Sequence, residues 1–129
     1  RMEKIPEAIV RKPGEGREYR MGRITAIFKA DREETNSASS VSEWWMEPDT
    51  EGPGIHQHPA SHLFYVIEGN LTVFLGGKGW LEAEKGTHIF IPGGVRHDFE
   101  NRSTEKAGFI SFNTPGGFEN DMPQIVEYW

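Results

Sequence analysis

The sequence contains no cysteine, and this absence narrows its chemistry before any motif is considered. Without thiols the chain can form neither a disulfide nor a thiolate metal site, and it has no cysteine nucleophile. Any metal site must therefore be built from histidine, carboxylate and water. The absence also suits a reducing compartment, and we expect a cytoplasmic protein.

Two further features are missing. No apolar run approaches the roughly 20 residues of a membrane-spanning helix, so we expect no membrane partner. Basic residues are scattered and the 129-residue chain carries a net charge of −6. Nucleic-acid phosphates call for a basic stripe, so we expect no nucleic-acid partner either.

Turn-forming residues are abundant, with 15 glycines and 8 prolines. Short apolar segments separated by turns about every eight to twelve residues predict one all-β domain, a sandwich or barrel. We expect a polar arm over residues 1–22 with a short strand at 7–11, a barrel over 23–114, and a C-terminal segment over 115–129 that packs on the barrel. Pro123 favours a short helix over a final strand there. The predicted barrel strands are residues 23–29, 41–47, 62–68, 71–75, 80–83, 87–91, 96–101 and 106–113, and Gly69-Asn70 predicts a hairpin turn.

Three of the five histidines lie close together, at His56, His58 and His62. Side chains alternate along a strand, so His56 and His58 point the same way, and a proline-containing bend lets His62 return to that face. His97 lies in a second Gly/Pro-rich segment and would approach from a neighbouring strand. A lone histidine is usually a satisfied or solvated residue, but this crowding favours a site for one metal ion.

The same segments resemble the two motifs of the cupin family. His56-Gln57-His58, followed by the run 64–69, is similar to the first motif. The second motif is matched by Gly86, Pro92, Gly94, His97 and Asn101. Residues 22–29 and 114–119 resemble the flanks of small single-domain, quercetin-dioxygenase-like cupins. The resemblance implies an antiparallel jelly-roll barrel with a metal inside one end.

The family ligands are two histidines of the first motif, a glutamate shortly after, and the histidine of the second motif. Carried over, they fall on His56, His58, position 62 and His97, and His62 stands where the family usually has glutamate. We therefore expect a four-histidine site for one divalent transition metal per chain, chosen among Fe, Ni, Cu, Mn and Zn. Four neutral imidazoles disfavour hard cations such as Mg or Ca.

The resemblance implies a metal-dependent dioxygenase for a small aromatic or enolisable substrate, either a flavonol-like phenol or a β-dicarbonyl. In quercetinase-type cupins the glutamate can act as the base, a role open to His62 only when it is unligated. One alternative is a non-redox cyclase or isomerase that uses the metal as a Lewis acid. Another is a small-molecule-binding cupin without turnover.

Strand alternation also predicts which residues surround the metal. Phe64, Val66 and Phe99 should face the interior, and one of Trp44 and Trp45 should face the cavity.

The opposite face of these strands would be apolar, formed by Tyr65, Ile67, Thr72 and Phe74, and we interpret it as the interface of a homodimer. His88, on the strand before Pro92, is expected to be a structural or surface residue.

Overall fold

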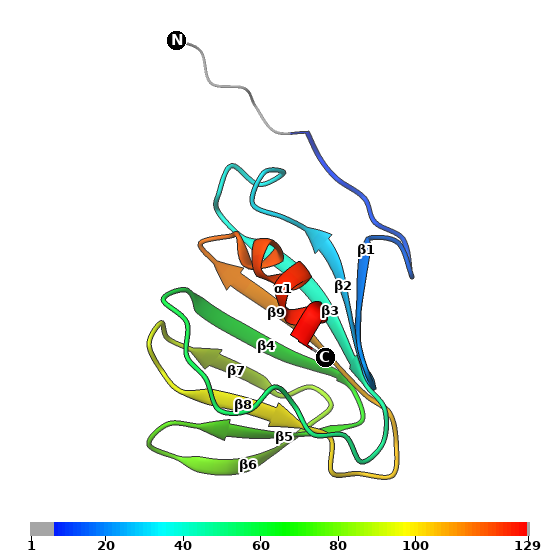
Figure 1. The fold of residues 1–129 in the computed structure, drawn as a ribbon, viewed down its shortest axis with the longest axis vertical. Helices are drawn as coiled ribbons and strands as arrows, with labels where there is room; N and C mark the ends of the chain where they lie inside the picture. The colour runs from blue at the N-terminus through cyan, green and yellow to red at the C-terminus, as the bar shows by residue number, and fades with distance from the viewer. Residues whose placement is uncertain (1–6, 129) are drawn as a thin grey trace.

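The computed structural model describes residues 7–128, which form two antiparallel sheets and a short C-terminal helix (Figure 1). One sheet has six strands in the order β1-β2-β3-β9-β4-β7, and the other has three in the order β6-β5-β8. The predicted all-β, antiparallel jelly-roll fold is confirmed, although the two sheets do not close into one hydrogen-bonded barrel within these residues. The strands are β1 (Arg17–Met21), β2 (Ile24–Ala30), β3 (Ser40–Met46), β4 (Ser61–Glu68), β5 (Asn70–Leu75), β6 (Gly79–Glu84), β7 (His88–Ile91), β8 (His97–Glu100) and β9 (Ala107–Thr114).

The N-terminal strand differs from the prediction. Residues 7–11 form no strand, and Ile9 and Val10 are exposed. The first strand is instead β1, which folds back on β2 across a tight turn and pairs Met21 with Ile24. This placement buries the Met21 side chain in the core, whereas residues 7–11 precede the turn at Pro13-Gly14 and pair with no described strand.

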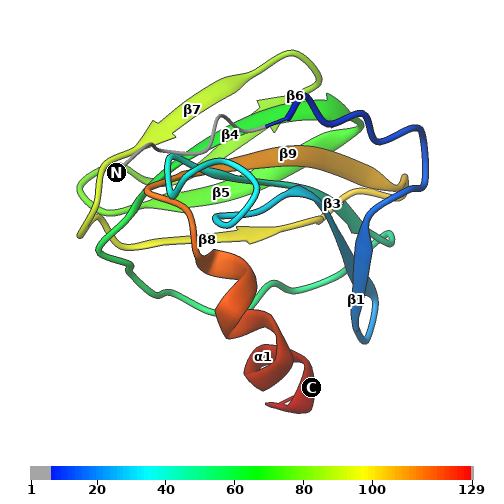
Figure 2. The same ribbon diagram turned by 90° about the horizontal axis from the view of Figure 1, so that it is seen from above.

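The C-terminal segment forms the predicted helix. A 3-10 turn, η1 (Phe118–Asp121), leads into α1 (Met122–Tyr128), and Pro123 lies in its first turn, where its missing N–H costs nothing. Figure 2 shows α1 on the opposite side of the molecule from β7. The last residue of the predicted segment, Trp129, lies outside the described residues. Within residues 7–128, no helix is long and apolar enough to cross a membrane.

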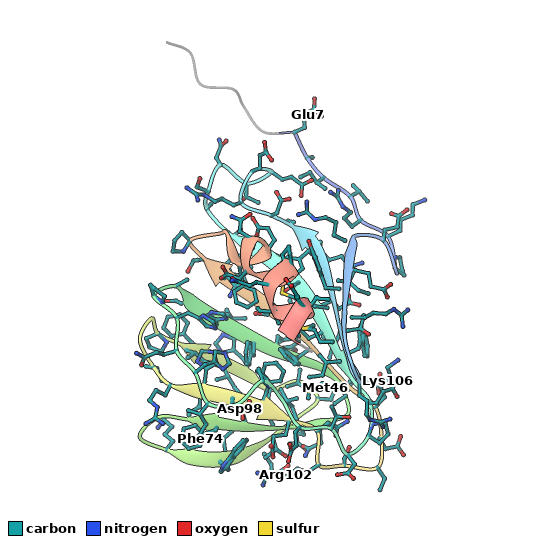
Figure 3. All side chains as sticks on the ribbon, in the orientation of Figure 1. Glu7, Met46, Phe74, Asp98, Arg102 and Lys106 are labelled. Atoms are coloured by element: carbon teal, nitrogen blue, oxygen red, sulfur yellow. The ribbon has the colours of Figure 1, made fainter. Side chains whose placement is uncertain are left out.

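The core lies between the two sheets, where side chains of both fill the space (Figure 3). Phe64 and Phe109 of the six-stranded sheet meet Phe99 of β8, with ring centroids 5.9 and 5.0 Å from it. Trp44 of β3 also meets Phe99, at 5.8 Å. Aromatic contacts therefore join the two sheets beside the region in which the histidines lie.

The predicted outer face is divided between the two sheets. Strands β4 and β5 follow one another but do not pair, because the chain passes at Gly69 from the six-stranded to the three-stranded sheet. The predicted hairpin is therefore wrong, and alternation cannot be carried across it. Tyr65 and Ile67 lie on one sheet, whereas Phe74 lies on the other and Thr72 is buried.

Candidate metal centre

The loop that carries the first histidines is bonded directly to β8. The backbone N–H of His56 donates to the carbonyl of His97 at 3.0 Å, and the N–H of His97 donates back at 2.8 Å. This isolated antiparallel pair brings the two residues face to face. Nearby, a Cβ on Gly93 would lie 2.1 Å from the carbonyl oxygen of Pro59, so only glycine allows the two segments to approach this closely.

Two buried polar side chains anchor the ends of this loop. The Asp98 carboxylate accepts from the N–H groups of Phe99 at 2.8 Å and Gly54 at 3.2 Å, while burial raises the pKa of that carboxyl. The Asn101 amide donates to the carbonyls of Met46, Glu47 and Glu105. These hydrogen bonds restrict the loop to few conformations, so its backbone holds the imidazoles in defined positions.

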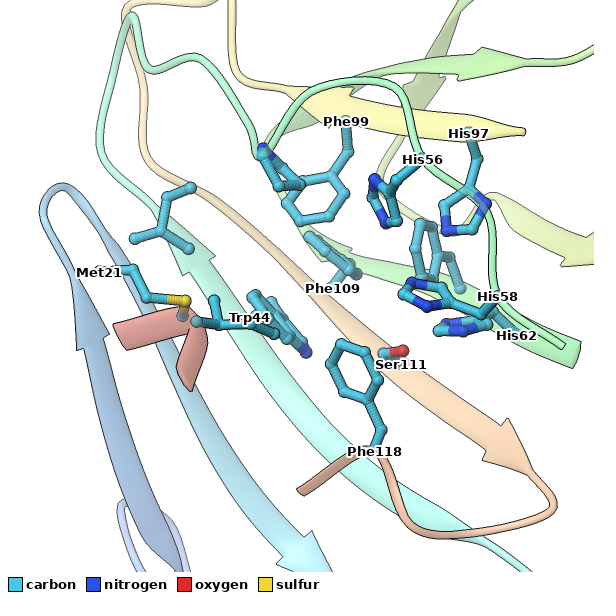
Figure 4. A pocket seen from close by; sticks show the side chains of 14 residues that line it. Met21, Trp44, His56, His58, His62, His97, Phe99, Phe109, Ser111 and Phe118 are labelled. Atoms are coloured by element: carbon cyan, nitrogen blue, oxygen red, sulfur yellow. The ribbon is translucent and has the colours of Figure 1, made fainter. Parts of the chain in front are cut away.

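All four predicted histidines come together (Figure 4). The ring centroids of His56 and His97 are 4.4 Å apart, and His58 is 4.7 Å from both His56 and His62. One ring nitrogen each of His56, His58 and His97 lies within 4.8 Å of the others, a grouping that could hold a metal ion. His62 stacks on His58, and its ring nitrogens lie against the amide of Asn113.

Hydrogen bonds determine which nitrogen of two rings is free. His56 Nδ1 lies 2.6 Å from the carbonyl oxygen of Gly54, and His97 Nδ1 lies 2.9 Å from that of Val95. A carbonyl only accepts, so each Nδ1 carries the proton and each Nε2 keeps its lone pair. His58 Nε2 is buried and has no hydrogen-bond partner within the described residues. A buried, unpartnered nitrogen beside two open lone pairs fits a transition metal.

Burial keeps these rings neutral. Burial, together with the smaller effect of the neighbouring imidazoles, lowers the pKa of His58 to about 4 and that of His62 to about 3. The pKa of His97 is lowered by the same desolvation. Neutral imidazole is the form that binds metals, so the site is ready for a cation at neutral pH.

A cavity of about 290 Å³ opens beside the histidines. Trp44, Phe64 and Phe99 line it, as the sequence predicts. Among its described lining residues none is Asp, Glu, Lys or Arg, and Ser111 is the only polar one besides the histidines. The lining is completed by Met21, Ile24, Pro53, Phe109, Phe118 and Ile125.

Two residues predicted for the pocket lie elsewhere. Trp45 alternates with Trp44 on β3 and so faces the outside of the sheet, where its indole bonds to Glu43 and packs near Lys106. Val66 points inward but is fully buried in the core beyond the cavity lining. His88 is exposed on β7, as expected.

Several site residues escaped the sequence prediction. Phe109, Ser111 and Asn113 lie at alternate positions of the predicted strand 106–113, so inward parity could have indicated them. Phe118 and Ile125 reach the cavity from η1 and α1, and no local pattern places a terminal helix over a given pocket.

Comparison with known proteins agrees with this geometry. The family model described as the cupin domain matches residues 42–113. A search of curated proteins finds no match. A predicted oxalate decarboxylase from Thermotoga maritima aligns at 18% identity and a TM-score of 0.74, over 83% of this chain and 99% of that one.

Two other solved structures are similar. An RmlC-like cupin from Shewanella frigidimarina aligns at 19% identity and a TM-score of 0.72, over 90% of this chain and 99% of that one. Oxalate decarboxylase from Bacillus subtilis, in a study of its Mn(II) centres, aligns at 17% identity and a TM-score of 0.75, over 92% of this chain but 32% of that one. At such identities these similarities support the fold and no more.

The first prediction concerns metal content. The wild-type protein should bind about one transition metal ion per chain, and His58→Ala should weaken Zn²⁺ binding at least about 100-fold, because it removes a ligand rather than an outer partner. Elemental analysis and calorimetric titration measure both quantities. His88→Ala, which removes an exposed histidine, is the matched control and should bind like the wild type. Equal Zn²⁺ affinity of the wild type, His58→Ala and His88→Ala would refute the proposed metal centre.

The second prediction concerns the metal-free protein in acid. The unfolded chain takes up protons near the ordinary histidine pKa of 6.5, whereas the folded His62 does so near 3. The free energy of unfolding should therefore fall as the pH drops below 6.5, by at most about 1.4 kcal/mol per pH unit from this ring. Thermal melts between pH 8 and 4 test this, and His62→Gln should flatten the slope. If the pH dependence of the stability is the same in the wild type and in His62→Gln, the low pKa of His62 is contradicted.

Proposed function

This chain belongs to the cupin family, and from that premise we propose that it is a metal-dependent dioxygenase for a small enolisable substrate, with β-dicarbonyl compounds as the favoured class. One observation carries the proposal: a set of imidazoles opens directly onto an apolar cavity whose described lining contains no charged residue. Such a site suits a substrate that places one oxygen at the metal and the rest of its body among aromatic rings.

The three histidines of the group are well suited to hold the metal. His56, His58 and His97 supply three nitrogen ligands and leave further positions open to substrate, as catalytic metal sites require. The metal, when bound, would supply Lewis acidity towards an enolate oxygen and redox chemistry towards O2. The metal would be one of Fe, Ni, Cu, Mn and Zn, and one structural neighbour is a protein with Mn(II) centres.

The cavity favours some substrates over others. Oxalate carries two carboxylates, and the second would face apolar side chains without a cationic partner. An enolate has a single charge, which the metal can neutralise. The volume of about 290 Å³ lies at the low end of ligand sites, which favours a β-dicarbonyl or one-ring phenol over a three-ring flavonol.

The protein residues have distinct parts in this proposal. The aromatic lining of Trp44, Phe64, Phe99 and Phe118 excludes water and packs the substrate body. The hydroxyl of Ser111 makes no hydrogen bond within the described part of the chain, so it is free to bind the second carbonyl oxygen. In the reaction of a β-dicarbonyl compound with O2, the bond between its central carbon and one carbonyl carbon breaks. Both atoms of O2 enter the products, a carboxylic acid and a 1,2-dicarbonyl compound.

The third prediction tests turnover. Protein reconstituted separately with Fe, Mn, Ni, Cu and Zn should consume O2 with at least one redox-active metal when given acetylacetone or a phenyl-substituted β-dicarbonyl. An oxygen electrode and product analysis measure the reaction. Ser111→Ala should lower kcat/KM about tenfold, the loss of one hydrogen bond to substrate, while metal content stays unchanged.

Two controls define the result. His58→Ala should abolish O2 consumption together with metal binding, and His88→Ala should leave both intact. Substrate conversion without O2 uptake would point to the Lewis-acid alternative, a cyclase or isomerase. Tight binding without conversion under any metal would identify a binding cupin.

We also propose a homodimer that uses the outer face of the six-stranded sheet. Across this face Phe90 of β7 pairs with Leu63 of β4, which pairs with Phe112 of β9. Phe90 is 57% exposed and Phe112 37%, beside Tyr65 at 43%. This uncharged strip reaches the edge strand β7, so a second copy related by a twofold axis could cover it without opposing like charges.

The fourth prediction follows from this strip. Phe90→Lys should convert the protein from dimer to monomer, because it introduces two like charges at a self-complementary contact. Light scattering coupled to gel filtration measures the mass. Val10→Lys changes a residue that is 79% exposed and lies outside the strands, and it should remain dimeric. A wild-type protein that is monomeric at about 100 µM would refute the interface.

A further inference from the structure

Asn113 is a buried polar residue whose hydrogen bonding is only half satisfied. It lies on β9, fully buried, directly opposite His62 of β4 in the strand register. Its amide nitrogen is 2.6 Å from His62 Nδ1 and 3.2 Å from Nε2. Its Oδ1 has no partner within residues 7–128. A buried amide oxygen without a partner is energetically unfavourable, so its presence beside the ring calls for a functional explanation.

The hydrogen bonds of the other imidazole rings indicate what the role of Asn113 is. At His56 and His97 a backbone carbonyl accepts the Nδ1 proton, which leaves Nε2 free as the ligand atom. His62 has no such carbonyl bonded to it in the described structure, and Asn113 is its one hydrogen-bonding neighbour. The tautomer of His62 therefore depends on which end of the amide faces the ring.

We propose that Asn113 is the positioning residue that makes His62 a fourth metal ligand, by presenting its Oδ1 to His62 Nδ1 when the metal is bound. When the amide nitrogen of Asn113 faces His62 Nδ1, the amide donates and Nδ1 accepts. The ring proton is then on Nε2, and the ring cannot bind a metal through Nε2. With the amide turned by 180°, Oδ1 accepts the Nδ1 proton and Nε2 presents its lone pair. The two ends of an amide are similar in size, so the buried site accepts both orientations.

The stacking of His62 against His58 makes this choice relevant to the metal. The ring centroids lie 4.7 Å apart and nearly parallel, and His62 is 5.2 Å from His97. His62 is thus beside the three-histidine group without belonging to it. A turn of the amide would free the lone pair of Nε2, and a shift of the ring towards His58 and His97 would then add His62 to the group as a fourth nitrogen ligand. This inference rests on the proposed metal site.

Two substitutions separate the possibilities. Asn113→Asp supplies an acceptor at both ends, so it should fix the Nδ1–H tautomer and hold metal affinity at or above the wild-type value. Asn113→Leu has similar size but no acceptor, and it should weaken Co²⁺ binding about 10- to 100-fold, the range for losing an outer-shell partner of a metal-bound histidine. Thr72→Val, a buried polar-to-apolar change remote from the cavity, is the control and should bind Co²⁺ like the wild type.

A spectroscopic readout distinguishes positioning from a general loss of stability. In ¹⁵N spectra of the imidazole nitrogens, assigned with His62→Gln, the Zn²⁺-loaded wild type should show His62 protonated at Nδ1 and metal-bound at Nε2. The Co²⁺ protein should lose one nitrogen ligand in Asn113→Leu, seen as a change in its d–d absorption.

The outcomes are separable from those of the proposed function. If wild-type His62 is protonated at Nε2 in the loaded protein, the inference is wrong even though the three-histidine centre stands. Equal Co²⁺ affinity and spectra for Asn113→Leu and wild type would refute it as well. The wild-type spectrum decides the question even if a variant fails to fold. Loss of metal binding in His58→Ala tests the centre itself.

Discussion

The site depends on one reciprocal backbone contact, the pair of hydrogen bonds between His56 and His97. Each residue is far from the other in sequence, and each comes from a different part of the jelly roll. The contact holds the loop of the first histidines against β8, so that the imidazoles of His56 and His97 lie side by side. Gly93 and Asn101 also keep these parts of the chain together: Gly93 allows the close approach of Pro59, and Asn101 bonds to the carbonyls of Met46 and Glu47.

The chemistry of the site follows from taking neutral rings out of water. His58, His62 and His97 lie where charge is poorly solvated, so their protonation is unfavourable and their lone pairs stay available. The apolar cavity shares this property, since it offers a substrate no charged side chain in its described lining. A cation in such a place would be the dominant local charge, and a singly charged oxygen ligand is its natural complement.

How much of this was predictable depends on the range of the interactions. The histidines are indicated by spacing alone, because alternation within a strand is local, and the family resemblance links His97 to them. Trp44 and Trp45 could not be separated, because the irregular loop between β3 and β4 breaks the count of faces. The hairpin prediction was wrong because the chain passes at Gly69 from one sheet to the other, which a local turn signal does not show. Asn113 lay within reach of parity, but its contact with His62 requires the register of two distant strands.

The cavity and the ligand set belong to different parts of the chain, and this has a consequence for biosynthesis. The histidines all lie between positions 56 and 97, whereas Met21 near the start and Phe118 and Ile125 near the end supply cavity walls. Glu119, which follows Phe118, ties η1 to the rest of the fold by accepting from the Ser40 hydroxyl and the Arg32 backbone N–H. During synthesis the four imidazoles therefore leave the ribosome before the terminal wall does.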